Sequence, residues 1–320
     1  HHATIRRQRQ MCIRDRASLE VSTIGFQAGN TADQIIGFSS RGPAPGGTLK
    51  PDIATPGVNI LAQGYTPNAD GEARHLGYGQ ASGTSMAGPH VAGAAVLLKQ
   101  LYPDWSNAAI KSALMSTAQY MDIYTTSGTP AQPLDMGSGR LDVAAAMDPG
   151  VILDPPSLSF STVASGTQKT ITVQVTNISN SAETYALSTL SYTDYFTETT
   201  DMAGVTASEA SITLAPGETK SVDITLDSAA SNGIGDNQGY ILMTGDTHSA
   251  HMAAWARVVP AVKTADVLIL DNDFSSLAPL AGTFAYDYRW YYTSALDELG
   301  YTYEVIDIDA NFGSATTIPE

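Results

Sequence analysis

Cysteine is almost absent from this sequence: Cys12 is the single one among 320 residues. A disulfide within the chain and a metal site built from cysteines are therefore excluded, because both require more than one cysteine. Long apolar runs are also lacking, and without 18 consecutive apolar residues no membrane span is predicted. No signal peptide is recognisable, but we expect the chain to begin inside a longer protein, so this absence is uninformative.

Basic residues are scarce in most of the chain. Lys and Arg total 16 against 32 Asp and Glu, which gives a net charge of −16. Five arginines lie within residues 1–16, a segment of charge +4, so the rest of the chain carries −20. This acidic surplus argues against nucleic acid or an anionic membrane as partner. It fits an extracellular protein that self-repulsion keeps soluble.

Residues 1–16 differ in composition from everything that follows. The segment has neither helical nor strand periodicity and resembles a translated sequencing adapter. We therefore predict a non-native segment and leave it out of the fold reasoning. A basic targeting arm is the alternative interpretation.

Ser85 is the most informative residue about function. It lies in Ser-Gly-Thr-Ser-Met-Ala-Gly-Pro-His-Val-Ala-Gly, residues 82–93, and an apolar, alanine-rich run follows. A serine at a tight turn that opens a helix presents its hydroxyl outward, and the free N–H groups of the first turn favour negative charge there. Small neighbours allow a substrate backbone to approach closely. The pattern predicts a nucleophilic serine.

Residues 83–93 resemble the nucleophile segment of the subtilisin-like serine peptidases (subtilases), with an unbroken match over eleven positions. The resemblance implies that Ser85 is the catalytic nucleophile of an Asp-His-Ser triad and that its backbone N–H donates to the oxyanion. It also implies that Thr84 and Gly83 support this site and that the substrates are proteins or peptides. Met86, next to the nucleophile, is expected to be prone to oxidation.

Other interpretations of this segment are weaker. A helix N-terminus rich in Ser and Thr is usually only a cap, but the length of the match favours the nucleophile. An α/β-hydrolase elbow requires Gly-x-Ser-x-Gly, and Ala87 occupies the place of the second glycine. His90 is expected to be a packed core histidine rather than the catalytic base.

Residues 17–148 alternate short apolar strands with helices, so the predicted class is α/β with a parallel sheet. Two loops, Phe-Ser-Ser-Arg-Gly-Pro at 38–43 and Pro-Asp-Ile-Ala-Thr-Pro-Gly at 51–57, also resemble subtilase landmarks. The resemblance covers the C-terminal part of the subtilase catalytic domain, which we therefore expect to be incomplete.

Two longer helices are predicted within this part. Ser85–Leu101 is apolar on most sides and is expected to be a central core helix. Asn107–Ala118 shows helical periodicity and has Ser106 as its expected N-cap. The other expected elements are strands at Val21–Gly25, Ile35–Ser40 and Val58–Ala62, a surface excursion at Tyr65–Gly79 and a short helix at Leu141–Met147.

Residues 149–262 are predicted to form a β-sandwich, after a linker at Pro149–Pro156. Apolar and polar residues alternate in several short segments, as in strands with one buried face. These segments are Thr170–Asn177, Ala210–Leu214, Lys220–Leu226, Tyr240–Thr244 and Ala253–Val259. The region resembles the fibronectin-III-like or immunoglobulin-like module of many large subtilases. A spacer or stabilising role is favoured over direct substrate binding.

Residues 263–320 contain one βαβ pattern, which predicts the start of a further, truncated α/β domain. A buried strand at Val267–Leu270 ends in Asp271-Asn272-Asp273, a helix follows at Trp290–Leu299, and Tyr303–Ile306 is a second strand. Acidic residues at the carboxyl end of such a strand can bind a metal or ligand. A plain loop carboxylate is the favoured interpretation here.

The expected triad is incomplete in this chain. In subtilases Asp and His precede Ser in Asp-Ser/Thr-Gly and His-Gly-Thr contexts, and neither context occurs here. His75 and His248 are not substitutes, so we expect the Asp, the His and the oxyanion Asn to lie outside the chain. No cofactor is expected for catalysis. Structural calcium is compatible with the resemblance, but no oxygen-rich ligand loop can be identified.

The leading hypothesis is a secreted serine endopeptidase, extracellular or on a bacterial cell surface, of which this chain alone is inactive. The alternative is a non-catalytic cell-surface or adhesive protein on a degenerate subtilase scaffold. An esterase is disfavoured by Ala87. The oligomeric state and the side-chain preference for substrates cannot be predicted from these residues.

Overall fold

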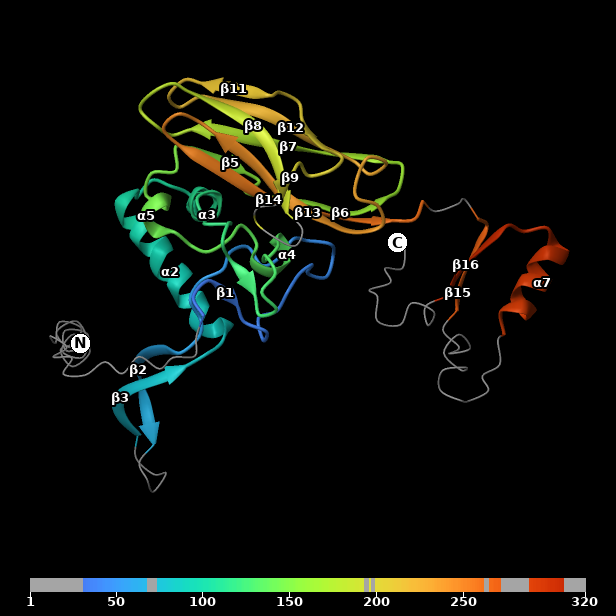
Figure 1. Cartoon of the computed structure of the whole chain (residues 1–320), viewed down its shortest axis with the longest axis horizontal. Helices are drawn as coiled ribbons and strands as arrows, with labels where there is room; N and C mark the ends of the chain where they lie inside the picture. Colours follow the sequence, from blue (N-terminus) through green and yellow to red (C-terminus); the bar gives the residue numbers. More distant parts are fainter. Residues whose placement is uncertain are drawn as a thin grey trace. The chain divides into compact units, whose positions relative to one another are not determined.

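The computed structural model describes residues 31–67, 74–192, 196, 199–261, 265–271 and 288–307. The expected segment 1–16, the expected strand at Val21–Gly25, and His1 and His2 lie outside these residues. Up to residue 147 the described chain combines helices with short strands (Figure 1). Its elements are β1 (Gln34–Ile35), β2 (Ile60–Pro67), β3 (Arg74–Ala81), α2 (Thr84–Leu101), α3 (Asn107–Ser116), β4 (Tyr124–Thr125), α4 (Pro133–Met136) and α5 (Val143–Ala146).

The helix α3 begins where the sequence predicts. The Ser106 hydroxyl accepts a hydrogen bond from the Ala109 N–H at 3.1 Å and so satisfies one of the free donors of the first turn. Ile110, Ala113 and Leu114 recur at helical spacing and are buried. They pack in one apolar cluster with Ala94 and Leu98 of α2.

The strands of this part differ from the prediction. The expected strand at Ile35–Ser40 is limited to β1, which forms a two-residue parallel pair with β4. The stretch expected to be a surface excursion, Tyr65–Gly79, belongs mostly to an antiparallel hairpin of β2 and β3. Pairing satisfies the backbone N–H and C=O groups of two polar, extended segments, and this requires no apolar face. The described residues of this part contain no larger parallel sheet.

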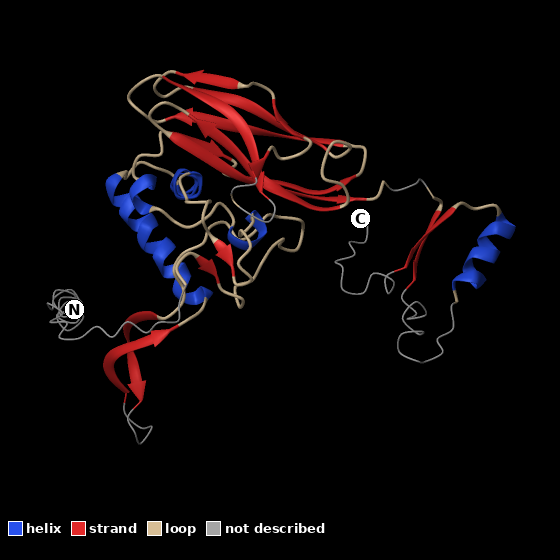
Figure 2. Cartoon of the chain, viewed as in Figure 1, coloured by secondary structure: helices blue, strands red, loops and turns tan. Residues whose placement is uncertain are grey.

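Residues 151–259 form a sandwich of two sheets (Figure 2). One sheet has the order β10-β12-β7-β5 and the other β11-β8-β13-β14-β6, with β9 paired to β8. The bounds are β5 (Val151–Asp154), β6 (Ser157–Ala164), β7 (Gln168–Asn177), β8 (Glu183–Tyr192), β9 (Thr199–Thr200), β10 (Val205–Ala207), β11 (Ser211–Leu214), β12 (Thr219–Asp227), β13 (Gly235–Thr244) and β14 (Ser249–Val259).

Four of the five segments predicted as strands lie within β7, β12, β13 and β14, and the fifth, Ala210–Leu214, begins one residue before β11. The linker expected at Pro149–Pro156 is wrong. Residues 151–154 form β5, which pairs with β7 and buries Val151 and Leu153. Two buried side chains on alternate positions are enough for an edge strand when a longer strand supplies the partner.

The sandwich packs on the preceding part through hydrogen bonds as well as apolar contacts. The Leu153 N–H donates to the Ser112 hydroxyl of α3 at 2.7 Å. The Tyr192 hydroxyl donates to the Ala131 carbonyl at 2.9 Å. Trp255 of β14 packs in one buried cluster with Met136 of α4. The sandwich therefore forms part of the same folded core as residues 33–147.

The last described residues form the predicted βαβ unit. β15 (Val267–Asp271) and β16 (Tyr303–Asp307) are parallel, and α7 (Arg289–Leu299) connects them. Gly300 ends α7 in the left-handed conformation, at φ 75°. Asp271, at the carboxyl end of β15, is buried and forms an ion pair with Arg289 at 2.9 Å. Asn272 and Asp273 lie outside the described residues.

Candidate active site

Ser85 lies in the first turn of α2, two residues after the N-cap Gly83. Its side chain is exposed, as the sequence predicts for a serine at a helix start. Among the described residues, the N–H groups of Thr84 and Ser85 have no hydrogen-bond partner, whereas those of Met86 and Ala87 donate to the Gly83 carbonyl at 3.0 and 3.3 Å. The free amides lie beside the hydroxyl, at the positive end of the helix dipole.

The loop at residues 55–59 fixes the start of α2. The Gly83 N–H donates to the Gly57 carbonyl at 2.8 Å. A Cβ on Gly57 would lie 2.9 Å from the Gly83 carbonyl oxygen, so only glycine allows these two backbones to approach this closely. The Thr55 hydroxyl donates to the Ala87 carbonyl at 2.8 Å. The loop therefore holds the first turn, and with it Ser85, in one orientation.

A second contact ties the same loop to the residue before the turn. The Asn59 N–H donates to the Ser82 hydroxyl at 2.8 Å. Asn59 has a φ of 54°, a region that Asn tolerates better than most residues. Sequence reasoning singled out this loop by its motif but missed the positioning roles of Thr55 and Asn59. Their partners lie 32 and 23 residues away along the chain, and no local pattern signals such pairs.

The expected burial of α2 is wrong for the described structure. Only Ala94 and Leu98 of this helix are buried. Val96, Leu97 and Leu101 are 66, 54 and 51% exposed. The helix packs through one side against α3, and none of the described strands runs along its other sides. The helix α2 therefore has more apolar side chains than the described neighbouring residues bury.

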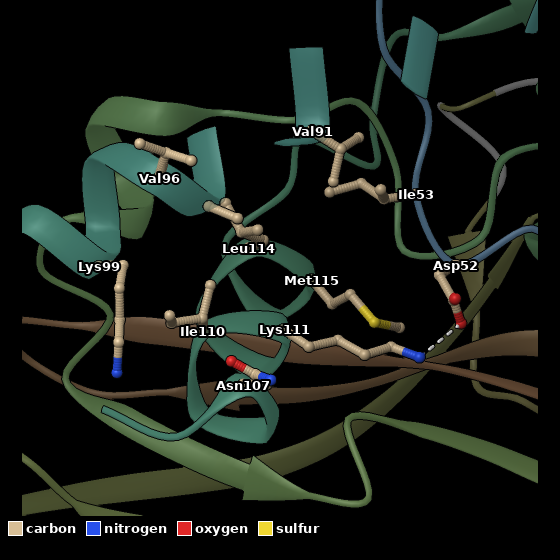
Figure 3. Close-up of a pocket in the computed structure, with 11 residues that line it drawn as sticks. Asp52, Ile53, Val91, Val96, Lys99, Asn107, Ile110, Lys111, Leu114 and Met115 are labelled. Atoms are coloured by element: carbon tan, nitrogen blue, oxygen red, sulfur yellow. Dashed lines mark ion pairs between the residues drawn. The ribbon is translucent and has the colours of Figure 1, made fainter. Parts of the chain in front are cut away.

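A cavity of ≈ 570 Å³ lies between α2 and α3 (Figure 3). Its lining is mostly apolar, with Asp52, Lys99 and Lys111 among the polar groups. Lys111 forms an ion pair with Asp52 at 3.1 Å. Burial raises the pKa of Asp52, but hydrogen bonds from Lys50 and Lys111 outweigh it and hold the pKa below its ordinary value. The lining contains none of residues 83–87, so this cavity is separate from the exposed serine.

The histidines whose side chains are described bond elsewhere than at Ser85. His90 is exposed, and its Nδ1 lies 2.9 Å from the Met86 carbonyl, one turn earlier. The expectation of a packed core histidine at this position is therefore wrong, since this face of α2 has no described neighbour. His248 lies in the turn between β13 and β14 and contacts Glu183 and Asp148. His251 is buried, with its Nε2 2.7 Å from the Ser138 carbonyl.

Metal ligands are not gathered anywhere in the described ranges: no group of three or more His, Cys, Asp or Glu there could hold an ion. In the same part of the chain, no helix is both long and apolar enough to cross a membrane.

Two family models match the chain. Residues 8–141 match the subtilase family, and residues 159–254 match an Fn3-like domain. The first match contains Ser85 and both landmark loops, and the second lies within the sandwich. The subtilase match begins at residue 8, inside the segment 1–16, and the prediction that this segment is non-native stays a prediction.

Several curated proteins that the chain resembles come from one plant. The chain is 44% identical over 146 residues to subtilisin-like protease SBT2.5 of Arabidopsis thaliana, covering 39% of this chain and 18% of that protein. It is 43% identical over 151 residues to SBT1.3 and 46% identical over 154 residues to SBT3.12 of the same plant, covering 43% and 41% of this chain and 19% of each of those proteins. The chain thus spans about a fifth of their length. The expected bacterial origin has no support among these relatives.

Proposed function

Residues 8–141 belong to the subtilase family and residues 159–254 are an Fn3-like domain, and from this premise we propose that the chain carries the nucleophile segment of a serine endopeptidase. Ser85 is the nucleophile in this proposal. The observation that carries it is the exposed serine in the first turn of α2, beside amides that no described group occupies.

The chemistry follows from this position. The Ser85 oxygen attacks the carbonyl carbon of a peptide bond, and the carbonyl oxygen becomes an oxyanion. The N–H of Ser85 is placed to donate to that oxygen, with Thr84 beside it, and Gly83 keeps the approach open. One oxyanion donor is worth about 3–4 kcal/mol of transition-state stabilisation. Release of the amine leaves an acyl-enzyme, which water then hydrolyses.

The reaction also needs a base and a carboxylate that orients it. His90, His248 and His251 have other partners in the structure, which supports the proposal that the His and Asp of the triad come from outside the described residues. The described chain on its own is then inactive, because the Ser85 hydroxyl keeps its proton at neutral pH without a base.

We further propose protein or peptide substrates and an extracellular location. The acidic body and the single cysteine support this location, and the relatives are named as proteases. No observation favours the alternative of a non-catalytic adhesive protein.

A fluorophosphonate probe tests the proposal in the longest protein that contains this chain. We expect labelling at Ser85 and cleavage of unfolded protein, both abolished by Ser85→Ala. Ser106→Ala is the matched control, because Ser106 is also a serine at a helix N-terminus but serves as a cap. Cleavage that persists in Ser85→Ala, or labelling lost equally in Ser106→Ala, contradicts the assignment.

A further inference from the structure

One histidine of the sandwich lies between two carboxylates that come from different parts of the chain. The His248 Nδ1 is 2.7 Å from Glu183 Oε2, on β8. Its Nε2 is 3.3 Å from Asp148 Oδ1, in the segment that joins α5 to β5. The His248 and Glu183 side chains are 11 and 5% exposed, whereas that of Asp148 is 81% exposed.

The Glu183 carboxylate is fixed on both of its oxygens. Oε1 accepts from the N–H groups of Thr247 and His248, each at 2.8 Å. Oε2 accepts from the Tyr185 hydroxyl at 3.0 Å as well as from His248. The carboxylate therefore cannot turn away when the charge on the imidazole changes.

Only a charged ring can donate a hydrogen bond to both carboxylates at once. A neutral imidazole has one N–H donor and one lone pair. With Nδ1–H bound to Glu183, a neutral ring would point its Nε2 lone pair at the oxygen of Asp148. The imidazolium has donors on both nitrogens and bridges the two groups. The observed pair of contacts thus matches the protonated form.

The contacts of His248 with Asp148 and Glu183 lie next to the start of β5, the first strand of the sandwich. The Gly150 backbone passes so close to the ring that an added Cβ would be 2.5 Å from the His248 side chain. The Gly150 carbonyl accepts from the Ile178 N–H at 2.9 Å. The contact of Asp148 with the ring and the hydrogen bond from Ile178 therefore hold the segment 148–150 on the sandwich, and local hydrogen bonds join it to Ala145 and Val151.

We propose that His248 is a pH-sensitive latch, which as an imidazolium bridges Asp148 to Glu183 and locks the segment 148–150 onto the sandwich, and as a neutral ring releases it. The titratable groups facing the ring are Glu183 and Tyr185 of β8 and Asp148 of the segment, and its own turn contributes Asp246. None of them is cationic. This latch is independent of the proposed catalytic role of Ser85.

The direction of the response follows from linkage. Burial lowers the pKa of His248, but the hydrogen bonds to Glu183 and Asp148 outweigh it, so the folded pKa lies above the ordinary value. The contribution of the latch to stability is therefore fully present at pH values below about 6.5, the pKa of an unfolded histidine. It is lost as the pH rises through the higher folded pKa.

The experiment measures the protonation of the His248 ring and the stability of the segment 148–150 in the same 320-residue chain. NMR titration reports the pKa of the His248 ring, and hydrogen exchange reports the protection factor of the Ile178 amide between pH 6 and 9. We expect the ring to titrate above 6.5 and the protection of Ile178 to fall with the same midpoint. The Leu187 amide, which donates to the Ala210 carbonyl elsewhere in the sandwich, is the internal control and should keep its protection.

Two variants separate the latch from general destabilisation. His248→Gln should remove the pH dependence at Ile178. Asp148→Asn changes an exposed group and should fold normally, while lowering the ring's pKa and shifting the loss of protection to lower pH. A ring that titrates at or below 6.5, or protection at Ile178 that does not follow the ring in either variant, overturns the proposal.

Discussion

His248, in the turn before β14, and His251, within β14, lie three residues apart, and their imidazoles have opposite electrostatic surroundings. His248 lies between the carboxylates of Glu183 and Asp148, whereas His251 is buried against the backbone carbonyl of Ser138. Charge on the His248 ring is compensated by these carboxylates, whereas no carboxylate of the described residues contacts the His251 ring. The two rings therefore respond to pH with opposite sign.

His251 should make the fold sensitive to acid. Burial lowers its pKa to about 4, only partly offset by hydrogen bonds to the Ser138 and Ser116 backbones. Because the unfolded ring titrates near 6.5, the unfolded state binds the proton first, and stability falls as the pH drops from about 6.5 to 4, by about 3 kcal/mol at most. Urea unfolding at pH 7 and pH 4 measures this. His251→Gln should lose less stability over the same range; an unchanged loss would contradict the assignment.

Replacing each of two serines of α3 by alanine should change the free energy of unfolding by very different amounts. Ser112 and Ser116 are both fully buried. The Ser112 hydroxyl accepts from the Leu153 N–H, whereas the Ser116 hydroxyl has no hydrogen-bond partner among the described residues. Ser112→Ala should cost about 1–3 kcal/mol, because it leaves a buried amide without an acceptor. Ser116→Ala should be close to neutral. Chemical denaturation of both variants checks this, and equal costs would disprove the hydrogen bond's importance.

Gly150 should not tolerate a side chain. Its φ is +70°, and an added Cβ would be 2.5 Å from His248 and 2.8 Å from the Tyr185 hydroxyl. Gly150→Ala should therefore cost about 2–4 kcal/mol, from backbone strain plus overpacking. Gly217 is the matched control, with φ +76° and open space around its Cβ position. Gly217→Ala should cost only the strain, about 1–2 kcal/mol. Thermal unfolding distinguishes the two, and similar losses would refute the packing argument.

The exposed side of α2 should cause the 320-residue chain to self-associate. Val96, Leu97 and Leu101 are each more than half exposed and present apolar surface. Leu97→Lys should reduce association, measured by light scattering, and change stability by less than about 0.5 kcal/mol. Leu98→Lys places the same charge at a buried position one residue further and should unfold the region. Association that is unaffected by Leu97→Lys would show that another surface is responsible.

The sequence predicted those helices and strands that are determined by residues close to one another along the chain. The Ser106 cap and the spacing of Ile110, Ala113 and Leu114 located α3, because both lie within one helix. Alternation of apolar and polar residues located β7, β11, β12, β14 and the second half of β13, but β6 and β8 were not predicted. Ser85 was found from its immediate neighbours and lies in the first turn of a helix, as predicted.

The features that the sequence did not predict depend on contacts between residues far apart along the chain. β5 has only four residues, and its burial comes from β7 and from Ser112. The exposure of His90 and Val96 depends on what packs against α2, which composition does not reveal. The contacts of Thr55 with Ala87, and of His248 with Asp148 and Glu183, join segments that no periodicity relates.

The hydrogen bond from Leu153 to Ser112 has a practical consequence for dividing this chain. The sequence period changes near residue 149, where one would ordinarily cut to produce two separate pieces. Such a cut would leave the buried Ser112 hydroxyl, the Ala131 carbonyl and the Ser138 carbonyl of the first piece without the donors that Leu153, Tyr192 and His251 now supply. It would also strip Met136 of its packing against Trp255. The boundary near residue 149 that composition indicates therefore lies inside a single hydrophobic core. We expect neither half of the chain to fold when it is expressed without the other.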